Sequence, residues 1–187
     1  MFESERIAGM NKIGEEVVLS IPQESDLPTI VEYLNDGEVM VELNPEWEPT
    51  TLENEIEQLR SAENDLSTVL WYIRIKDSCI GAAWINKIDI EKKSGSFGIM
   101  IGDKNRWGQG IAITVANAIS EYAFGKGDLN LVHVSLTEKN EGSRIVALKA
   151  GYTLHKGQAR FVGEATYEGW EGELTKENWT RNQHKND

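Results

Sequence analysis

The stretch Asp103–Ile119 reads DKNRWGQGIAITVANAI, and it places two glycines, Gly108 and Gly110, between a basic turn and the start of a helix. Glycine tolerates a positive φ and lets another molecule approach the backbone closely. The first turn of a helix carries free N–H groups, which attract anions together with the helix dipole. The stretch therefore predicts a site for a phosphate or diphosphate group. The alternative interpretation is an ordinary strand-to-helix turn.

Two well-known phosphate loops do not fit this stretch. A dinucleotide-binding loop carries a third glycine or alanine where Ile113 stands, and it follows a βαβ unit rather than a series of hairpins. The phosphate loop of nucleoside triphosphatases ends in Gly-Lys-Ser or Gly-Lys-Thr, an ending that is missing here. An unrelated nucleotide-binding domain stays open as an alternative.

Working outward from the glycines, hydrophobic periodicity predicts a mixed order of strands and helices. Pro28 fits only in the first turn of an early helix, and Thr50 or Thr51 caps the next one. Gly151 is a left-handed helix stop. The predicted strands cover 15–20, 67–75, 79–90, 94–102, 131–136, 153–159 and 167–174, and the predicted helices cover 27–35, 50–64, 111–124 and 140–151.

This order of elements predicts the α/β class with a mixed (α+β) sheet. An antiparallel meander forms the first half, and a right-handed strand–helix–strand crossover follows in the second. No repeat or linker divides the chain, so we expect a single domain over residues 1–187, with a core at about 13–179 and flexible ends. The polar tail RNQHKND is expected to be frayed.

The composition is that of an ordinary globular chain of 187 residues, with 40% hydrophobic and 27% charged residues. No run approaches the roughly 18 apolar residues that a membrane span needs, and the first residues do not resemble a signal peptide. The net charge of −12 argues against nucleic acid and anionic membranes as partners. Lys104 and Arg106 lie beside the two glycines, with Lys126, Lys139, Arg144 and Lys149 further on, so the cations are concentrated in the stretch where the phosphates are predicted.

Cys79 is the only cysteine, which excludes an internal disulfide and fits a reducing cytoplasm. Its apolar neighbours favour a small buried strand residue over a nucleophile. Of the three histidines, His133 lies in a predicted strand and His155 and His184 are expected to be exposed. No pair of them has metal-ligand spacing, so we expect no metal.

A second segment, Thr137–Tyr152, reads TEKNEGSRIVALKAGY and contains Asn140, Ser143, Lys149 and Gly151 in the order Asn-x-x-Ser, Lys, Gly-aromatic. Together with the segment Trp107–Ala112, which reads WGQGIA, it resembles the GNAT acyltransferase superfamily, of the ribosomal-protein N-terminal acetyltransferase type. That family's loop has the pattern Gln/Arg-x-x-Gly-x-Gly/Ala, and a tryptophan stands here at its first position. The resemblance extends from about Ile13 to Trp179.

The resemblance implies an acetyl-CoA site between two parallel strands that splay apart, here 96–101 and 131–137, with the pantetheine arm lying between them like an extra strand. It implies that Asn140 holds the pantetheine arm, although a helix N-cap is an equal explanation for an asparagine there. Trp107 either packs under the loop or borders the cofactor. The implied cofactor-binding residues are Met100, Ile101, Trp107, Gly108, Gln109, Gly110, Ile111, Ala112, Asn140 and Ser143.

Acetyl transfer to an amine needs an acid for the departing thiolate and a neutral nucleophile. The superfamily's usual tyrosine falls on Ala147, so the resemblance assigns the acid to Ser143; the alternative is a polar residue in the first turn of a helix. The usual glutamate base falls on Ser96, which is a poor base. Glu138, Asp89 and Glu91 are the substitutes, although each also fits a surface carboxylate.

The resulting prediction is an acetyl-CoA-dependent N-acetyltransferase that acts on a primary amine, either a protein N-terminus or a small amine. The alternative is a non-catalytic acyl-CoA-binding module. Trp71, Trp84 and Trp170 are candidates for an acceptor pocket or for core packing, and the acidic stretch 38–49 is a candidate rim that favours a cationic acceptor. We expect a cytoplasmic monomer or homodimer.

Overall fold

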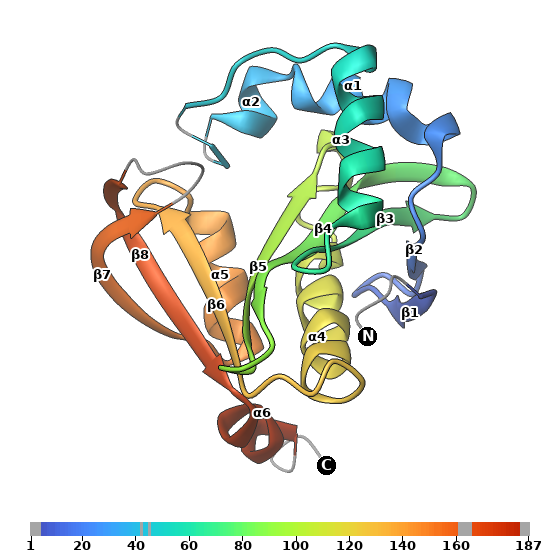
Figure 1. Ribbon diagram of the computed structural model, residues 1–187. Helices are drawn as coiled ribbons and strands as arrows, with labels where there is room; N and C mark the ends of the chain where they lie inside the picture. The colour runs from blue at the N-terminus through green and yellow to red at the C-terminus, as the bar shows by residue number, and fades with distance from the viewer. Residues whose placement is uncertain (1–4, 42, 45, 161–165, 184–187) are drawn as a thin grey trace.

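The computed structural model describes residues 5–41, 43–44, 46–160 and 166–183. These residues form an eight-stranded mixed sheet in the order β1-β2-β3-β4-β5-β6-β8-β7 (Figure 1). All neighbouring strands are antiparallel except β5 and β6, which are parallel. The predicted fold class is therefore confirmed, with the meander in β2–β5 and the crossover in β5–α4–β6.

The elements follow the predicted periods closely. The strands are β1 (Ile7–Met10), β2 (Glu16–Ser20), β3 (Val69–Ile75), β4 (Ser78–Asp89), β5 (Ser94–Ile101), β6 (Leu131–Thr137), β7 (Thr153–Arg160) and β8 (Thr166–Thr175). The helices are α1 (Leu27–Leu34), α2 (Gly37–Met40), α3 (Leu52–Asn64), α4 (Ile111–Phe124), α5 (Glu141–Ala150) and α6 (Lys176–Gln183), with short 3₁₀ turns η1 (Glu24–Asp26) and η2 (Lys104–Arg106).

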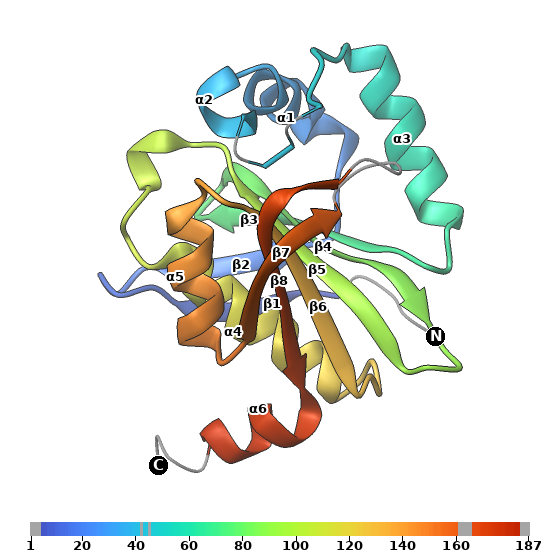
Figure 2. The same ribbon diagram turned by 90° about the vertical axis from the view of Figure 1, so that its left-hand side faces the viewer.

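Helices cover the two faces of the sheet unequally. The larger core packs α4 and α5 against one face, with side chains such as Ile111, Val115 and Ile119 buried against the strands. A smaller core packs α1–α3 on the opposite face over β3, β4 and β5 only. Both ribbon views show α1–α3 gathered away from β6, β7 and β8 (Figures 1 and 2). Among the described residues, no helix packs on that face of β6 and β8.

Local signals fix the helix ends. The Thr51 hydroxyl accepts a hydrogen bond from the Asn54 amide at 3.3 Å, so Thr51 rather than Thr50 caps α3. Pro28 lies in the first turn of α1. The residue after α5, Gly151, has a φ of 94°, as the predicted left-handed stop requires.

The chain's ends contain more structure than expected. The prediction of a frayed tail is wrong for residues 181–183, which belong to α6; residues 184–187, His184 among them, lie outside the described residues. The centroid of the Trp179 ring lies 5.6 Å from that of the Phe124 ring, and this contact attaches α6 to α4. The sequence of α6 is polar and has no hydrophobic repeat, so its helix was not predicted. The strand β1 precedes the expected core and was missed because it has only four residues.

Cys79 is buried in the smaller core, as predicted. Burial raises the pKa of its thiol to about 11, because the thiolate would lose its hydration. In the part of the chain that the structure describes, no three metal-ligating side chains cluster. Within that same part, every helix is too short or too polar to cross a bilayer.

Candidate functional site

The parallel strands β5 and β6 are paired over only the first part of their length. The paired residues run from Ser94 with Leu131 to Ser96 with His133. Beyond that point β5 continues to Ile101 and β6 to Thr137, and the two strands diverge (Figure 1). The sheet therefore opens into a gap between two strands that are each still paired on their other side.

Register decides which backbone groups face this gap. The Gly102 amide donates to the Ile80 carbonyl at 2.9 Å, so alternate residues of β5, including Met100, point their N–H and C=O toward β4. The backbone groups of Ile99 and Ile101 consequently point into the gap. Met100 offers the gap neither its backbone nor its side chain, which is buried in the smaller core.

The same reasoning applies to β6. The Lys176 amide donates to the Asn130 carbonyl at 2.9 Å, which directs even-numbered residues of β6 toward β8. Ser135 and Thr137 therefore direct their backbone groups toward β5. The gap presents polar backbone on both sides, which is the arrangement that receives an extended chain by strand addition.

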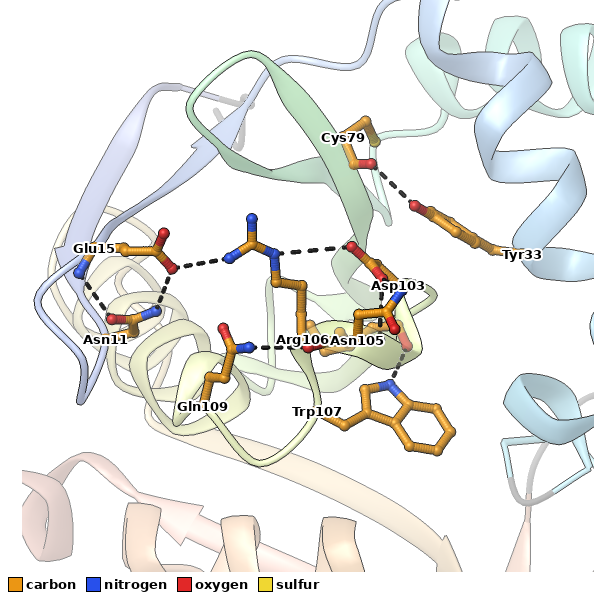
Figure 3. A network of polar contacts seen from close by, with 10 residues as sticks. Asn11, Glu15, Tyr33, Cys79, Asp103, Asn105, Arg106, Trp107 and Gln109 are labelled. Atoms are coloured by element: carbon orange, nitrogen blue, oxygen red, sulfur yellow. Dashed lines mark hydrogen bonds and ion pairs between the residues drawn. The ribbon is translucent and has the colours of Figure 1, made fainter.

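The loop from Asp103 to Gly110 connects the end of β5 to α4. The Trp107 indole Nε1 donates to the Ile101 carbonyl at 2.8 Å, and the Gln109 side-chain nitrogen donates to the Asn105 carbonyl at 2.9 Å (Figure 3). Trp107 thus both pins the loop to β5 and stays about half exposed, at 49%. In this position Trp107 can both pack under the loop and border a bound cofactor, so the two interpretations are compatible.

Two positive φ angles shape the loop into an anion nest. Gly108 has a φ of 73° and Gly110 a φ of 82°, conformations that other residues adopt only with strain. Among the described residues, no acceptor takes the N–H groups of this turn and of the first turn of α4. These groups belong to Gly108, Gly110, Ile111, Ala112 and Ile113.

Free N–H groups at the N-terminus of a 14-residue helix attract an anion through hydrogen bonds and the helix dipole. Ile111 contributes only its N–H, because its side chain is 2% exposed. The loop lies at the end of β5, where the gap between the strands is open. The nest and the gap therefore fit a molecule that joins a diphosphate to an extended polar chain.

Most of the cations that sequence analysis placed in the phosphate-binding stretch form ion pairs with carboxylates of the protein. Lys104 contacts Asp36 and Glu38 at 2.7 and 2.5 Å, and Arg106 contacts Glu15 at 3.0 Å. Lys126 pairs with Glu5 and Arg144 with Glu141. The partners of Lys104, Arg106 and Lys126 are distant in the sequence, so no local pattern indicated these pairs. The structure also places Lys12, a residue that sequence analysis missed, against Gly110 of the nest.

Asn140 and Ser143 form the start of α5, directly after β6. The Asn140 side-chain oxygen accepts a hydrogen bond from the Ser143 amide at 2.9 Å, so Asn140 is the N-cap, as its alternative interpretation stated. The Ser143 side chain is half-buried, and its hydroxyl has no partner among the described residues. Ala147 is buried and carries no polar group. The free hydroxyl therefore stands near the open end of the gap.

The carboxylates considered as bases lie in different places. Ser96 forms the last parallel pair with His133 at the closed end of the gap. Asp89 pairs with Ser94 at the opposite end of β5, and hydrogen bonds from the Lys92 amide and ammonium lower the pKa of its carboxyl group. Glu91 lies in the same turn, so neither carboxylate reaches the open end. Glu138 follows β6 directly and forms an ion pair with Lys156.

A further carboxylate, which sequence analysis missed, lies on the uncovered face beside the gap. The Ser135 hydroxyl lies 3.1 Å from both carboxylate oxygens of Glu171 on the neighbouring strand β8. Two residues away on each strand, on the same face, His133 Nδ1 lies 3.6 Å from the Glu173 carboxylate. The register of β6 with β8 was needed to find these pairs.

The candidate acceptor tryptophans divide among three environments. Trp71 is fully buried against Tyr122, and Trp170 packs under Arg144 on the helical face. Trp84 lies across Gly98 of β5, because a Cβ there would be 2.2 Å from its indole. Neighbouring residues of a strand face opposite sides of the sheet, and the side chain of Ile99 packs in the larger core. Gly98 therefore faces the side of the smaller core, and Trp84 lies on that side, beside the gap.

The candidate rim, residues 38–49, reaches across toward β8, although residues 42 and 45 lie outside the described residues. The Glu46 carboxylate hydrogen-bonds the Tyr167 hydroxyl of β8 and raises its pKa. The Trp47 indole donates to the Leu34 carbonyl and anchors the rim to α1. The rim, Trp84 and the Ser135–Glu171 pair thus surround the uncovered side of the gap.

Comparison with known proteins agrees with this geometry. The family model "Acetyltransferase (GNAT) domain" matches residues 16–153. No curated protein matches the sequence significantly. Among solved structures, Mycobacterium smegmatis RimJ in complex with CoA-disulfide has a TM-score of 0.75 at 15% identity, over 92% of this chain and 87% of that one.

Two further structures have the same fold. Vibrio cholerae spermidine N-acetyltransferase, in complex with CoA and spermine, has a TM-score of 0.76 at 17% identity, over 88% of this chain and 98% of that one. The ribosomal L7/L12 acetyltransferase RimL, in complex with CoA, has a TM-score of 0.73 at 17% identity, over 85% and 93% of the two chains. At these identities the likeness establishes the fold.

Proposed function

Because the chain belongs to the GNAT acetyltransferase family, we propose that it transfers the acetyl group of acetyl-CoA to a primary amine, either a protein N-terminus or a small amine. The single observation that carries this proposal is that two features adjoin: a gap between β5 and β6, where Ile99 and Ser135 have no partner strand residue across the gap in the described part of the chain, and an anion nest where β5 runs into α4. CoA joins an extended pantetheine chain to a diphosphate, and it fits both features at once.

The residues of the nest and the gap have separable tasks. The amides of Gly108 and of residues 110–113 hold the diphosphate, and the backbone groups of Ile99 and Ser135 hydrogen-bond the pantetheine arm. When bound, acetyl-CoA supplies the acetyl group as a thioester. Holding the amine beside that thioester provides much of the rate enhancement, because the reaction becomes effectively unimolecular.

Two side chains carry the proton transfers. The Ser143 hydroxyl donates a proton to the sulfur that leaves, which agrees with its lack of another partner among the described residues. The Glu171 carboxylate, positioned by Ser135, takes a proton from the amine. Glu171 replaces Ser96 in this role, because serine cannot accept a proton at neutral pH.

The chemistry of the uncovered face supports an amine-bearing acceptor. Glu171 and Glu173 lie on this face, and Glu46 lies on its rim. A protonated amine is attracted to such carboxylates before it loses its proton. The named acceptors of structures with this fold, a ribosomal protein and spermidine, differ in size. A panel of amines is therefore needed to choose between them.

The proposed setting is the cytoplasm, with the protein acting as a monomer or homodimer. Cys79 is the only cysteine and is buried, so the fold needs no oxidising compartment. The acidic net charge of −12 supports partners other than nucleic acid and anionic membranes.

The proposal is tested by binding and turnover measured together. Calorimetric titration should show that CoA binds and that ATP and NAD do not bind comparably. Release of free thiol from acetyl-CoA should then depend on an added amine from a panel of N-terminal peptides, polyamines and amino sugars. CoA binding without thiol release for any amine would favour the acyl-CoA-binding module, and absence of CoA binding would exclude both.

A further inference from the structure

The turn between β1 and β2 is closed by internal hydrogen bonds and presents one lysine, Lys12. Asn11 is 5% exposed, and its side-chain oxygen accepts hydrogen bonds from the amides of Ile13 at 3.1 Å and Glu15 at 2.9 Å. The backbone N–H of Asn11 donates to the backbone carbonyl of Glu15 at 2.9 Å. Lys12 follows Asn11 directly and is exposed. Its position is therefore set by a hydrogen-bonded turn.

This turn is fastened to the anion nest from two sides. Glu15 forms an ion pair with Arg106 of the loop at 3.0 Å, and both side chains are largely buried, at 26% and 29% exposure (Figure 3). The Thr114 hydroxyl, in the first turn of α4, donates to the Met10 carbonyl at 3.1 Å. The turn thus behaves as a third wall of the nest, in addition to the loop and the helix.

Lys12 lies directly against the N-cap of α4. A Cβ placed on Gly110 would be 3.1 Å from Lys12 Cγ, 3.2 Å from its Cβ and 3.3 Å from its amide nitrogen. The start of the Lys12 side chain therefore lies against Gly110, the residue that caps the helix, and the ammonium group is three bonds beyond its Cγ. Among the described residues, no carboxylate pairs with this ammonium, in contrast to Lys104 and Arg106.

The electrostatics of the site call for such a cation. The chain carries a net charge of −12 and must attract a polyanionic cofactor. The charge–dipole interaction at a helix N-terminus contributes only about 0.3–1 kcal/mol. The loop's own cations are engaged by Asp36, Glu38 and Glu15. A lysine ammonium is a compact point charge that suits phosphate oxygens.

We propose that Lys12 binds the diphosphate of CoA and that the β1–β2 turn is part of the cofactor site. This inference rests on the proposed function, since it concerns the same cofactor. The turn contributes a positive charge that no carboxylate of the described residues neutralises, unlike the ion-paired cations of the loop, and the Glu15–Arg106 ion pair holds the turn beside the nest.

The test compares Lys12→Gln with Lys87→Gln, an exposed lysine at the opposite end of the sheet without an ion pair in the described part of the chain. Calorimetry measures the affinity of each protein for CoA, for dephospho-CoA, which lacks the 3′-phosphate, and for pantetheine, which lacks all phosphates. Lys12→Gln should weaken CoA and dephospho-CoA equally, by about 10-fold at low salt, as expected for one charge-assisted hydrogen bond. Pantetheine should be unaffected, and Lys12→Arg should restore most of the affinity.

The outcomes separate this inference from the proposed function. If the unsubstituted protein binds CoA and Lys12→Gln binds it equally well, only the role of Lys12 is wrong. A loss seen with CoA but absent with dephospho-CoA would move Lys12 to the 3′-phosphate and overturn the diphosphate assignment. If the unsubstituted protein does not bind CoA, the proposed function and this inference fail together. Thermal unfolding of Lys12→Gln should match that of the unsubstituted protein, because Lys12 is exposed.

Discussion

The Trp107 indole donates its Nε1 hydrogen to the carbonyl oxygen of Ile101, 2.8 Å away, and so joins the anion-nest loop to the last residue of β5. Ile101 is one of the residues whose backbone faces the gap, so this bond occupies a group that would otherwise be open. It fixes the loop relative to the strand, and it leaves Ile99 as the nearer backbone position for the pantetheine arm.

Replacing Trp107 with phenylalanine should therefore weaken CoA binding without unfolding the protein. The ring is retained, but the bond to Ile101 is lost, and a net hydrogen bond contributes about 1 kcal/mol, which corresponds to about fivefold in affinity. Calorimetric titration with CoA measures the change. Trp179→Phe is the matched control, because the Trp179 indole nitrogen has no partner among the described residues and lies on α6. Equal affinity for CoA in Trp107→Phe and the control would contradict the role of this bond.

The two nest glycines should differ in their tolerance of alanine. Both have positive φ, which costs an alanine about 1–2 kcal/mol. A Cβ on Gly108 would meet nothing within 4 Å, whereas one on Gly110 would press on Lys12 at 3.1–3.3 Å. Gly110→Ala should thus lower the free energy of unfolding by about 1 kcal/mol more than Gly108→Ala. Urea denaturation of both variants measures their free energies of unfolding. Equal decreases would show that the turn containing Lys12 shifts away from the new methyl group at no cost.

Features carried by short-range signals could be predicted from the sequence. The helix α4 begins and ends as expected, because glycines flank an apolar periodic stretch. The parallel pair β5–β6 followed from the crossover, and its splaying from the family resemblance. Asn140 was expected at a helix start because asparagine is a preferred cap.

Features that depend on residues far apart in the sequence could not be predicted. Glu15 and Arg106 are 91 positions apart, and their pairing shows only once β1 and β2 lie beside the loop. Ser135 and Glu171 meet because of the register of β6 and β8. The local charge of the nest was misjudged for the same reason, because the acidic partners of Lys104 come from α2 and the residue before it.

The buried thiol of Cys79 should react slowly in the native protein. Burial raises its pKa from 9.0 to about 11, so at pH 8 the thiolate fraction falls by about 100-fold relative to an unperturbed thiol. Alkylation by iodoacetamide at pH 8 should be slower by at least that factor in the native protein than in urea. Since the native pKa is the higher one, this group contributes stability below about pH 9 that is lost as the pH rises toward 11. Similar rates in the two states would show that the thiol is accessible.

Ser143→Ala should lower kcat by about 100-fold and leave CoA affinity unchanged, if the hydroxyl donates the proton to the leaving sulfur. The cap bond to Asn140 uses the Ser143 amide rather than its hydroxyl, so α5 should stay folded. Thiol release at saturating acetyl-CoA and amine measures kcat, and Ser61→Ala, an exposed serine on α3, serves as the control. A near-normal kcat would remove Ser143 from the mechanism.

Glu171→Gln tests the proposed proton acceptor on the uncovered face. Glutamine keeps the shape of the side chain and still accepts a hydrogen bond from Ser135, but it cannot take a proton from the amine. The variant should lose about 100-fold in kcat/KM for the amine, while its affinity for CoA stays the same. Glu173→Gln is the matched control, since it changes a carboxylate on the same strand and face, next to His133. If both variants lose activity equally, Glu171 acts only through the general charge of the face, which attracts the amine without accepting its proton.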